Sequence, residues 1–241
     1  MKTNEVLENI KARRSVRAYT DRQVSEEDLQ AILEAATFAP SGMHLETWHF
    51  TAIQNADKLA ELNERIKGAF AKSDEPKLQE RGHSKAYCCY YHAPTLVIVS
   101  NEPTQWWAGM DCACAIENMF LAAHSLGIGS CWINQLGTTC DDPEVREFIS
   151  SLGVPENHKV YGCVALGYAD PKISLREKMV KAGTVTVVRY RTRLCFRQTW
   201  NGMKSSMITV RFRSRFLCSF SSVLIGIRSV LNKGKPGAHI C

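Results

Sequence analysis

The stretch DCACAIENMFLAAHSLGIGSCWIN, residues 111–134, decides the architecture of this chain. It continues an apolar run that begins at Trp107, and apolar side chains cover nearly the whole circumference of the helix that the run predicts, as far as Leu126. Such a helix lies at the centre of a protein or at a subunit interface. Gly127 is expected to end it in the left-handed conformation, and the rest of GIGSCWIN leads into a strand.

Outward from this stretch, the chain predicts helices and strands in mixed order. Further strands are expected over residues 48–54, 94–100 and 159–170, and PTLVIVS is apolar enough to be buried on both faces. Helices are expected over 3–12, from a capping box at Ser25 as far as Pro40, over 56–72 and from Pro143 to Ile149. A polar stretch follows residue 72 through Gly82. This mixture predicts an α+β or α/β sandwich.

Composition indicates a protein with a substantial core and an unusual C-terminal part. Of the 241 residues, 45% are hydrophobic, and no 18-residue apolar window predicts a membrane span. Because the N-terminal residues include acids and form no apolar region, we expect no signal peptide and a cytoplasmic location. The ten cysteines are then expected to be reduced thiols. Cys112 and Cys114 would point about 200° apart on a helix, so no shared metal is expected.

Charge divides the chain into two parts. Residues 1–189 carry 20 Lys and Arg against 24 Asp and Glu, whereas residues 190–241 carry 10 Lys and Arg and no acid. The prediction is one domain over 1–189 and a basic, poorly ordered extension over 190–241. Two further hypotheses for the extension stay open: a sequence translated out of frame, or a basic tail that binds nucleic acid or an anionic surface.

A second cluster of charge lies near the N-terminus, in KARRSVRAYT, residues 11–20. Arg13, Arg14, Ser15 and Arg17 together suit either a solvated basic patch or a bound phosphate. Guanidinium groups bind phosphate through paired, charge-assisted hydrogen bonds, and a hydroxyl adds one donor. The local sequence alone does not decide between the two.

Four segments taken together resemble a known family: RRSVRAY (13–19), APSGMHLETWHF (39–50), DCACAIENMFLAAHSLGIGSCWIN (111–134) and VALGYAD (164–170). In order and spacing they resemble the FMN-dependent nitroreductases, a family of NAD(P)H oxidoreductases, over residues 3–189. The resemblance implies an α+β three-layer sandwich with a central mixed, mainly antiparallel sheet, in a domain-swapped homodimer. It also implies that Arg13, Arg14, Ser15 and Arg17 bind the FMN phosphate and ribityl chain.

The same resemblance implies two further parts of an FMN site at the subunit interface. One is the loop Pro40, Ser41, Gly42, Met43 and His44, which would reach the flavin of the partner subunit. His44, Glu46 and Thr47 depart from the Asn, Gln and Pro usual in the family, which puts the flavin hydrogen bonds there in question. The other is the end of the strand, where backbone groups of Ile133, Asn134 and Gln135 would face flavin N5.

Arg176 and Lys178 resemble a last basic group that closes over the phosphate, with Arg189 as an alternative. Five aromatic residues are candidates for a lid or for core and dimer contacts: Tyr87, Tyr90, Tyr91, Trp106 and Trp107.

The activity implied is hydride transfer from NAD(P)H to a nitroaromatic, a quinone or a similar conjugated acceptor, by a ping-pong mechanism and with no catalytic side chain. The alternatives are a flavin-binding relative without reductase activity and a binder of nucleic acid or anionic surfaces through the basic tail. Apart from that tail, no nucleic-acid or membrane partner is expected.

Overall fold

A computed structural model describes residues 2–175 and 177–188. The chain divides into two compact units, residues 1–184 and 185–241, and the second lies almost entirely outside the described residues. The predicted domain boundary at residue 189 therefore stays a prediction. The elements of the first unit are α1 (Glu5–Ala12), α2 (Glu26–Thr37), the 3₁₀ turn η1 (Gly42–His44), β1 (His49–Ile53), α3 (Ala56–Ala71), α4 (Pro76–His83), β2 (Thr95–Asn101), α5 (Ala108–Ser125), β3 (Gly129–Ile133), α6 (Gln135–Thr139), α7 (Pro143–Ser151) and β4 (Lys159–Gly167).

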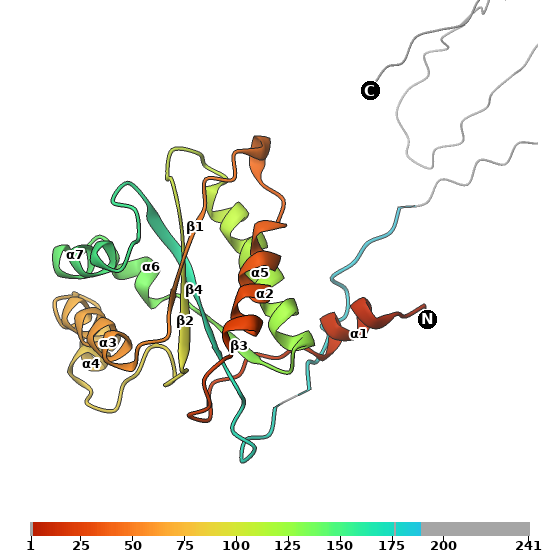
Figure 1. Cartoon of the computed structure of the whole chain (residues 1–241), viewed down its shortest axis with the longest axis horizontal. Coiled ribbons are helices and arrows are strands. Elements are labelled where there is room, and N and C mark those ends of the chain that lie inside the picture. The colour runs from red at the N-terminus through yellow and green to blue at the C-terminus, as the bar shows by residue number, and fades with distance from the viewer. Residues whose placement is uncertain (1, 176, 189–241) are drawn as a thin grey trace, which may run out of the picture. The chain divides into compact units, whose positions relative to one another are not determined.

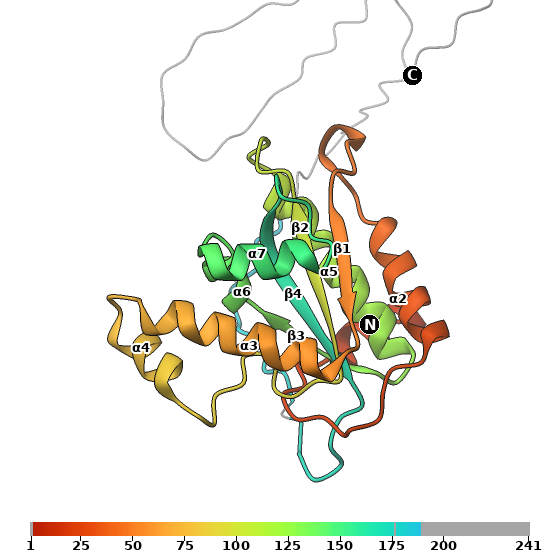
Figure 2. The ribbon, with the colours of Figure 1, turned by 60° about the vertical axis from the view of Figure 1, so that its left-hand side comes forward.

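The four strands form one sheet in the order β1-β2-β4-β3, and each neighbouring pair is antiparallel. β2 and β4 lie in the middle, and a bulge at Val99 and Ser100 interrupts their register. β3 is an edge strand whose outer side makes one parallel bridge, from Ser130 to Ser15. Figures 1 and 2 show α2 and α5 on one face of the sheet and α3, α4, α6 and α7 on the other. The predicted α+β three-layer fold is confirmed.

Each face of the sheet has its own hydrophobic core. Toward α2 and α5 the middle strands place Val97, Val99, Val164 and Leu166. Toward α3, α6 and α7 they place Leu96, Ile98, Cys163 and Ala165. All seven residues of β2 are buried because successive side chains alternate between two covered faces. The apolar run PTLVIVS is thus explained by the layers around it.

Local signals set most helix boundaries. The side chains of Ser25, Asn55 and Asp142 accept backbone N–H groups at the starts of α2, α3 and α7. Gly127 has φ +74° just after α5, as expected. Sequence patterns missed α4, which lies inside the stretch predicted only as polar, and they also missed α6. Over the described residues, no helix is both long enough and apolar enough to cross a bilayer.

We expect Gly162→Val to destabilise the fold, because Gly162 lies in β4 directly beneath side chains of β3 and α5. A Cβ at this position would come within 2.8 Å of Cζ2 of Trp132 and 3.0 Å of Cδ1 of Ile116. Forcing extra carbon into such a space costs about 1–3 kcal/mol. Urea denaturation should show this loss in the free energy of unfolding. Gly68→Ala is the control, because Gly68 lies in α3 with nothing within 4 Å of its missing Cβ; equal stability of the two variants would contradict the prediction.

Candidate functional site

The N-terminal basic segment runs along the outer edge of the sheet. Ser15 forms the parallel bridge with Ser130, and the Val16 N–H donates to the Ser130 carbonyl at 2.9 Å. Further on, Tyr19 forms an antiparallel bridge with Ala169, and its hydroxyl donates to the Val16 carbonyl at 2.7 Å. Burial raises the pKa of Tyr19, so this hydroxyl remains a donor. These contacts fix the backbone that carries the arginines.

A cavity of about 380 Å³ opens beside this segment. Its lining residues are Arg14, Ser15, Arg17, Ala18, Ile173, Ser174 and Leu175. None of these seven residues is acidic, and two are arginines. The Nη1 of Arg14 donates to the carbonyls of Lys11 and Arg13 at 2.6 Å each, which holds its guanidinium against the end of α1. The cavity therefore presents positive charge and hydroxyl groups, the donor set that suits a phosphate.

Arg13 and Arg17 extend toward different layers of the sandwich. Arg13 lies over the Phe120 ring of α5, 5.4 Å from its centroid, with its Nε 3.9 Å from Glu117. Arg17 lies 6.0 Å from the ring centroid of Tyr91, on the other side of the sheet edge. Burial raises the pKa of the nearby Cys131 thiol, and the charge of Arg17 lowers it by less. Of the four predicted residues, the structure thus brings Arg14, Ser15 and Arg17 together at the cavity, while Arg13 lies against α5.

The loop from Pro40 to His44 is held at the other end of α5. The Gly42 N–H donates to both carboxylate oxygens of Asp111, at 3.1 and 3.2 Å. The Trp107 indole lies so close to Gly42 that a Cβ there would collide with it. Beyond this anchor Met43 and His44 take left-handed φ values of 57° and 53°, which are uncommon outside glycine. Met43 is 81% exposed, so the loop presents its side chain on the surface of the chain.

Within one chain, the loop and the basic segment lie far apart. The loop is bonded to Asp111, whereas the helix that precedes the basic segment is bonded to Leu121 through the side chain of Asn9. Ten residues of α-helix separate these attachment points, a rise of about 15 Å. The structure therefore does not bring Pro40–His44 to the basic cavity of the same chain.

The end of β3 forms the third predicted part. Ile133 is buried and pairs with Cys163 of β4. The Asn134 side chain accepts from the Trp132 indole N–H at 2.9 Å, and the Asn134 backbone N–H donates to the side-chain oxygen of Gln135 at 3.0 Å. A ligand that needed this backbone donor would have to displace the Gln135 side chain.

The remaining predicted residues have mixed outcomes. Arg176 and Arg189 lie outside the described residues, and Lys178 lies exposed in a segment that belongs to no helix or strand. Among the aromatic candidates, Tyr90 is buried in the core, Tyr87 and Tyr91 pack half-buried against it, and Trp106 is exposed. Sequence reasoning missed Asp111 and the wall Ile173–Leu175. Only Asp111 shows a signal in the sequence, as the single acid in the first turn of a mostly apolar helix.

The structure is thus an α+β protein with a basic cavity beside the edge strand β3 of its antiparallel sheet, and the donors that line this cavity suit a phosphorylated ligand. A model described as "Nitroreductase family" matches residues 10–168, and the chain belongs to this family. The predicted resemblance is confirmed.

Solved structures and relatives agree with this assignment. A nitroreductase from Bacteroides fragilis, crystallised with bound FMN, is 78% identical with a TM-score of 0.77, and the match covers 78% of this chain and all of that one. An FMN-bound nitroreductase from Desulfitobacterium hafniense is 29% identical with a TM-score of 0.70 and the same coverage. A protein of Archaeoglobus fulgidus, provisionally named NADH dehydrogenase/NAD(P)H nitroreductase, is 37% identical over 68% of this chain and 85% of its own length.

Proposed function

We propose that the protein is an FMN-dependent oxidoreductase that passes hydride from NAD(P)H to a nitroaromatic, a quinone or a similar conjugated acceptor. The observation that carries this proposal is the basic cavity at the edge of β3, in a chain closely similar to a nitroreductase that binds FMN. FMN, when bound, supplies the hydride-accepting and hydride-donating ring. The protein then has to bind, orient and shield it.

Three groups of residues would share that work. Arg14, Ser15 and Arg17 fit a phosphate, because they offer charged and hydroxyl donors with no acid among the lining residues. Ile133–Gln135 would lie at the reacting edge of the ring, where backbone and amide dipoles stabilise developing negative charge. No catalytic side chain is needed, since hydride moves between cofactor and substrate. Arg13 and Lys178 remain candidates for further phosphate contacts.

A homodimer with its flavin sites at the subunit interface would complete the site. The loop Pro40–His44 lies about 15 Å along α5 from the attachment of the basic segment, so it would serve the partner subunit. Apolar side chains are exposed where such a contact would form. They include Val6 and Ile10 on α1, which has no buried residue, Met43 in the loop and Met110 on α5. Burying these side chains would favour association.

The test is the visible absorption spectrum of the purified protein, before and after anaerobic addition of NADH or NADPH. We expect a flavin spectrum that bleaches with at least one nicotinamide and returns on addition of a quinone or nitroaromatic. Parallel double-reciprocal plots would support the ping-pong order. Flavin that stays oxidised with both reductants would indicate a flavin-binding relative without reductase activity. A protein that remains colourless after incubation with FMN would contradict the proposal.

A further inference from the structure

A second cavity, of about 470 Å³, lies against α4 and the loop after it. Its lining residues are Lys77, Glu80, Arg81, Ser84, Ala86 and Tyr87. None of them belongs to the cavity beside Arg14 and Ser15, and the proposed flavin contacts leave all of them without a role. No sequence motif singles out this region, because the stretch before Gly82 is simply polar.

Close backbone packing and buried hydrogen bonds fix the walls of this α4 cavity. Gly82 lies against the end of α3, where a Cβ would come within 2.5 Å of the Ala71 nitrogen. The buried Asn63 side chain donates to the Tyr87 carbonyl at 3.1 Å and accepts from the Cys89 N–H at 2.9 Å. Because both attachments are to α3, α4 and Tyr87 are held in place relative to each other.

Tyr87 connects the α4 cavity to the end of β3. The guanidinium of Arg81 lies 5.8 Å from its ring centroid. Its hydroxyl is buried and makes no hydrogen bond of standard geometry with any described residue. The Gln135 side chain lies near enough to this hydroxyl to lower its pKa, although burial raises that pKa by more. Tyr87 therefore lines the α4 cavity and also lies near Gln135, the first residue of α6 at the proposed reacting edge.

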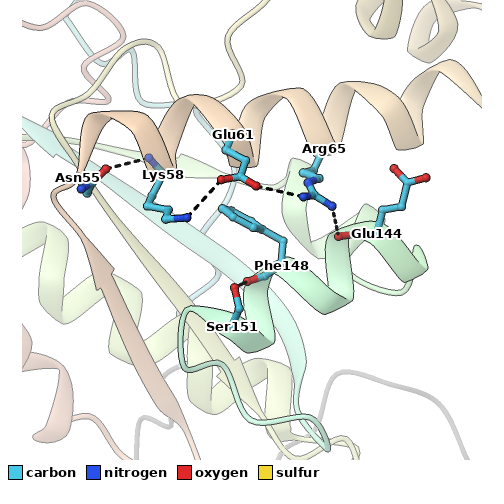
Figure 3. Close-up of polar contacts among 7 residues, drawn as sticks. All are labelled: Asn55, Lys58, Glu61, Arg65, Glu144, Phe148 and Ser151. Carbon is cyan, nitrogen blue, oxygen red and sulfur yellow. Dashed lines mark hydrogen bonds and ion pairs between the residues drawn. The ribbon is translucent and has the colours of Figure 1, made fainter.

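The cations of the α4 cavity differ from those of the neighbouring helix α3 in their ion pairing. On α3, Lys58 and Arg65 both pair with Glu61, at 3.3 and 3.0 Å (Figure 3). Within the described part of the chain, neither Lys77 nor Arg81 forms an ion pair. Both nevertheless line the same cavity, with Glu80 as the single acid among its lining residues. Two cations without an ion-pair partner among the described residues suit an anionic group of a ligand. The aromatic ring of Tyr87 beside them suits a conjugated part of the same ligand.

We propose that the α4 cavity is an anion subsite in which Lys77 and Arg81 bind a phosphate or carboxylate of the ligand that exchanges hydride with the flavin beside Gln135. The inference rests on the proposed function for the identity of that ligand. The anion has two possible sources: the additional phosphate that distinguishes NADP(H) from NAD(H), or a carboxylate on the acceptor.

Equilibrium binding tests the subsite without requiring turnover. Calorimetric titration of the purified, FMN-supplemented protein would compare NADP⁺ with NAD⁺, and 4-nitrobenzoate with 4-nitrobenzamide. We expect the member of at least one pair that carries the additional anionic group to bind about fivefold more tightly, since two exposed ion pairs each contribute modestly. The pair that shows the preference identifies the source of the anion. The preference should shrink as salt is added.

The double variant K77Q/R81Q should bring that ratio close to one. The matched control is K58Q/R65Q, which removes the same two charges from α3 and should keep the preference. An absent preference in both pairs, or a preference that survives K77Q/R81Q, would overturn the subsite. The proposed function fails on different evidence, when the flavin of the unaltered protein is not reduced by either nicotinamide.

Discussion

Replacing both Ser15 and Arg17 with alanine is expected to yield a protein that folds but is purified without FMN. Both residues line the basic cavity, and the backbone between them is fixed by the Val16 hydrogen bond to Ser130. A hydrogen bond to a charged group such as phosphate contributes about 1.5–3 kcal/mol, and both side chains would make one. Losing both should weaken FMN binding by about two to four orders of magnitude.

The measurement is fluorescence titration of the apoprotein with FMN, together with the ratio of flavin to protein absorbance after purification. Lys172→Ala is the matched control, because Lys172 is an exposed cation close in sequence to the cavity wall but is not a lining residue. Its FMN affinity should stay within about twofold of that of the unaltered protein. Full retention of FMN by S15A/R17A, with an intact far-ultraviolet spectrum, would show that the phosphate binds elsewhere.

The elements of the fold were predictable where burial dictates the sequence. α5 and β2 are apolar because other layers cover them, so their residues record the architecture directly. α4 carries one leucine, Leu78, among polar residues, and its position depends on the close packing of Gly82 against α3. α6 contains Gly137 and two threonines, which are weak helix formers. For such short helices the tertiary contact decides the conformation, and a single sequence does not reveal that contact.

The candidate site also has parts that the sequence predicts and parts that it does not. The basic residues after α1 stand out as charged and hydroxyl donors close together in the chain, but only the family resemblance favours a phosphate over a solvated patch there. Their cavity is completed by Ile173–Leu175, about 160 residues later, whose side chains carry no chemical signature. The family resemblance indicates the loop Pro40–His44. Its contact with Asp111 on α5 is seen only in the structure. Sequence reasoning does not reveal contacts between segments that lie far apart in the chain.

The second large effect is expected from Asp111→Ala, which removes the carboxylate that anchors the loop Pro40–His44 to α5. Asp111 is 7% exposed, and its carboxylate is the acceptor for the Gly42 N–H. Alanine would leave this donor without its partner, at a cost of about 1–3 kcal/mol. The loop also holds Met43, His44 and Glu46 at positive φ, each at a cost on the order of 1 kcal/mol. Without the carboxylate, we expect the loop to relax toward ordinary backbone conformations.

Under the proposed dimer, a relaxed loop would no longer contact the flavin of the partner subunit. Asp111→Ala should therefore alter the visible circular dichroism of bound FMN and lower the rate of its reduction by about tenfold or more. FMN should stay bound, because the basic segment proposed to hold its phosphate is attached near the other end of α5. Asp111→Asn retains one carbonyl acceptor for Gly42, so it should recover most of the rate.

A control is needed for the accompanying loss of stability. Asp142→Ala removes a carboxylate that caps α7, at about 1 kcal/mol, without touching the loop. If the loop conformation matters, D142A should lower the melting temperature while leaving the flavin dichroism and reduction rate unchanged, whereas D111A changes all three. Should D111A reduce its flavin as fast as the unaltered protein, the Asp111 contact would be purely structural. The strained backbone of Met43 and His44 would then serve a purpose unrelated to the flavin.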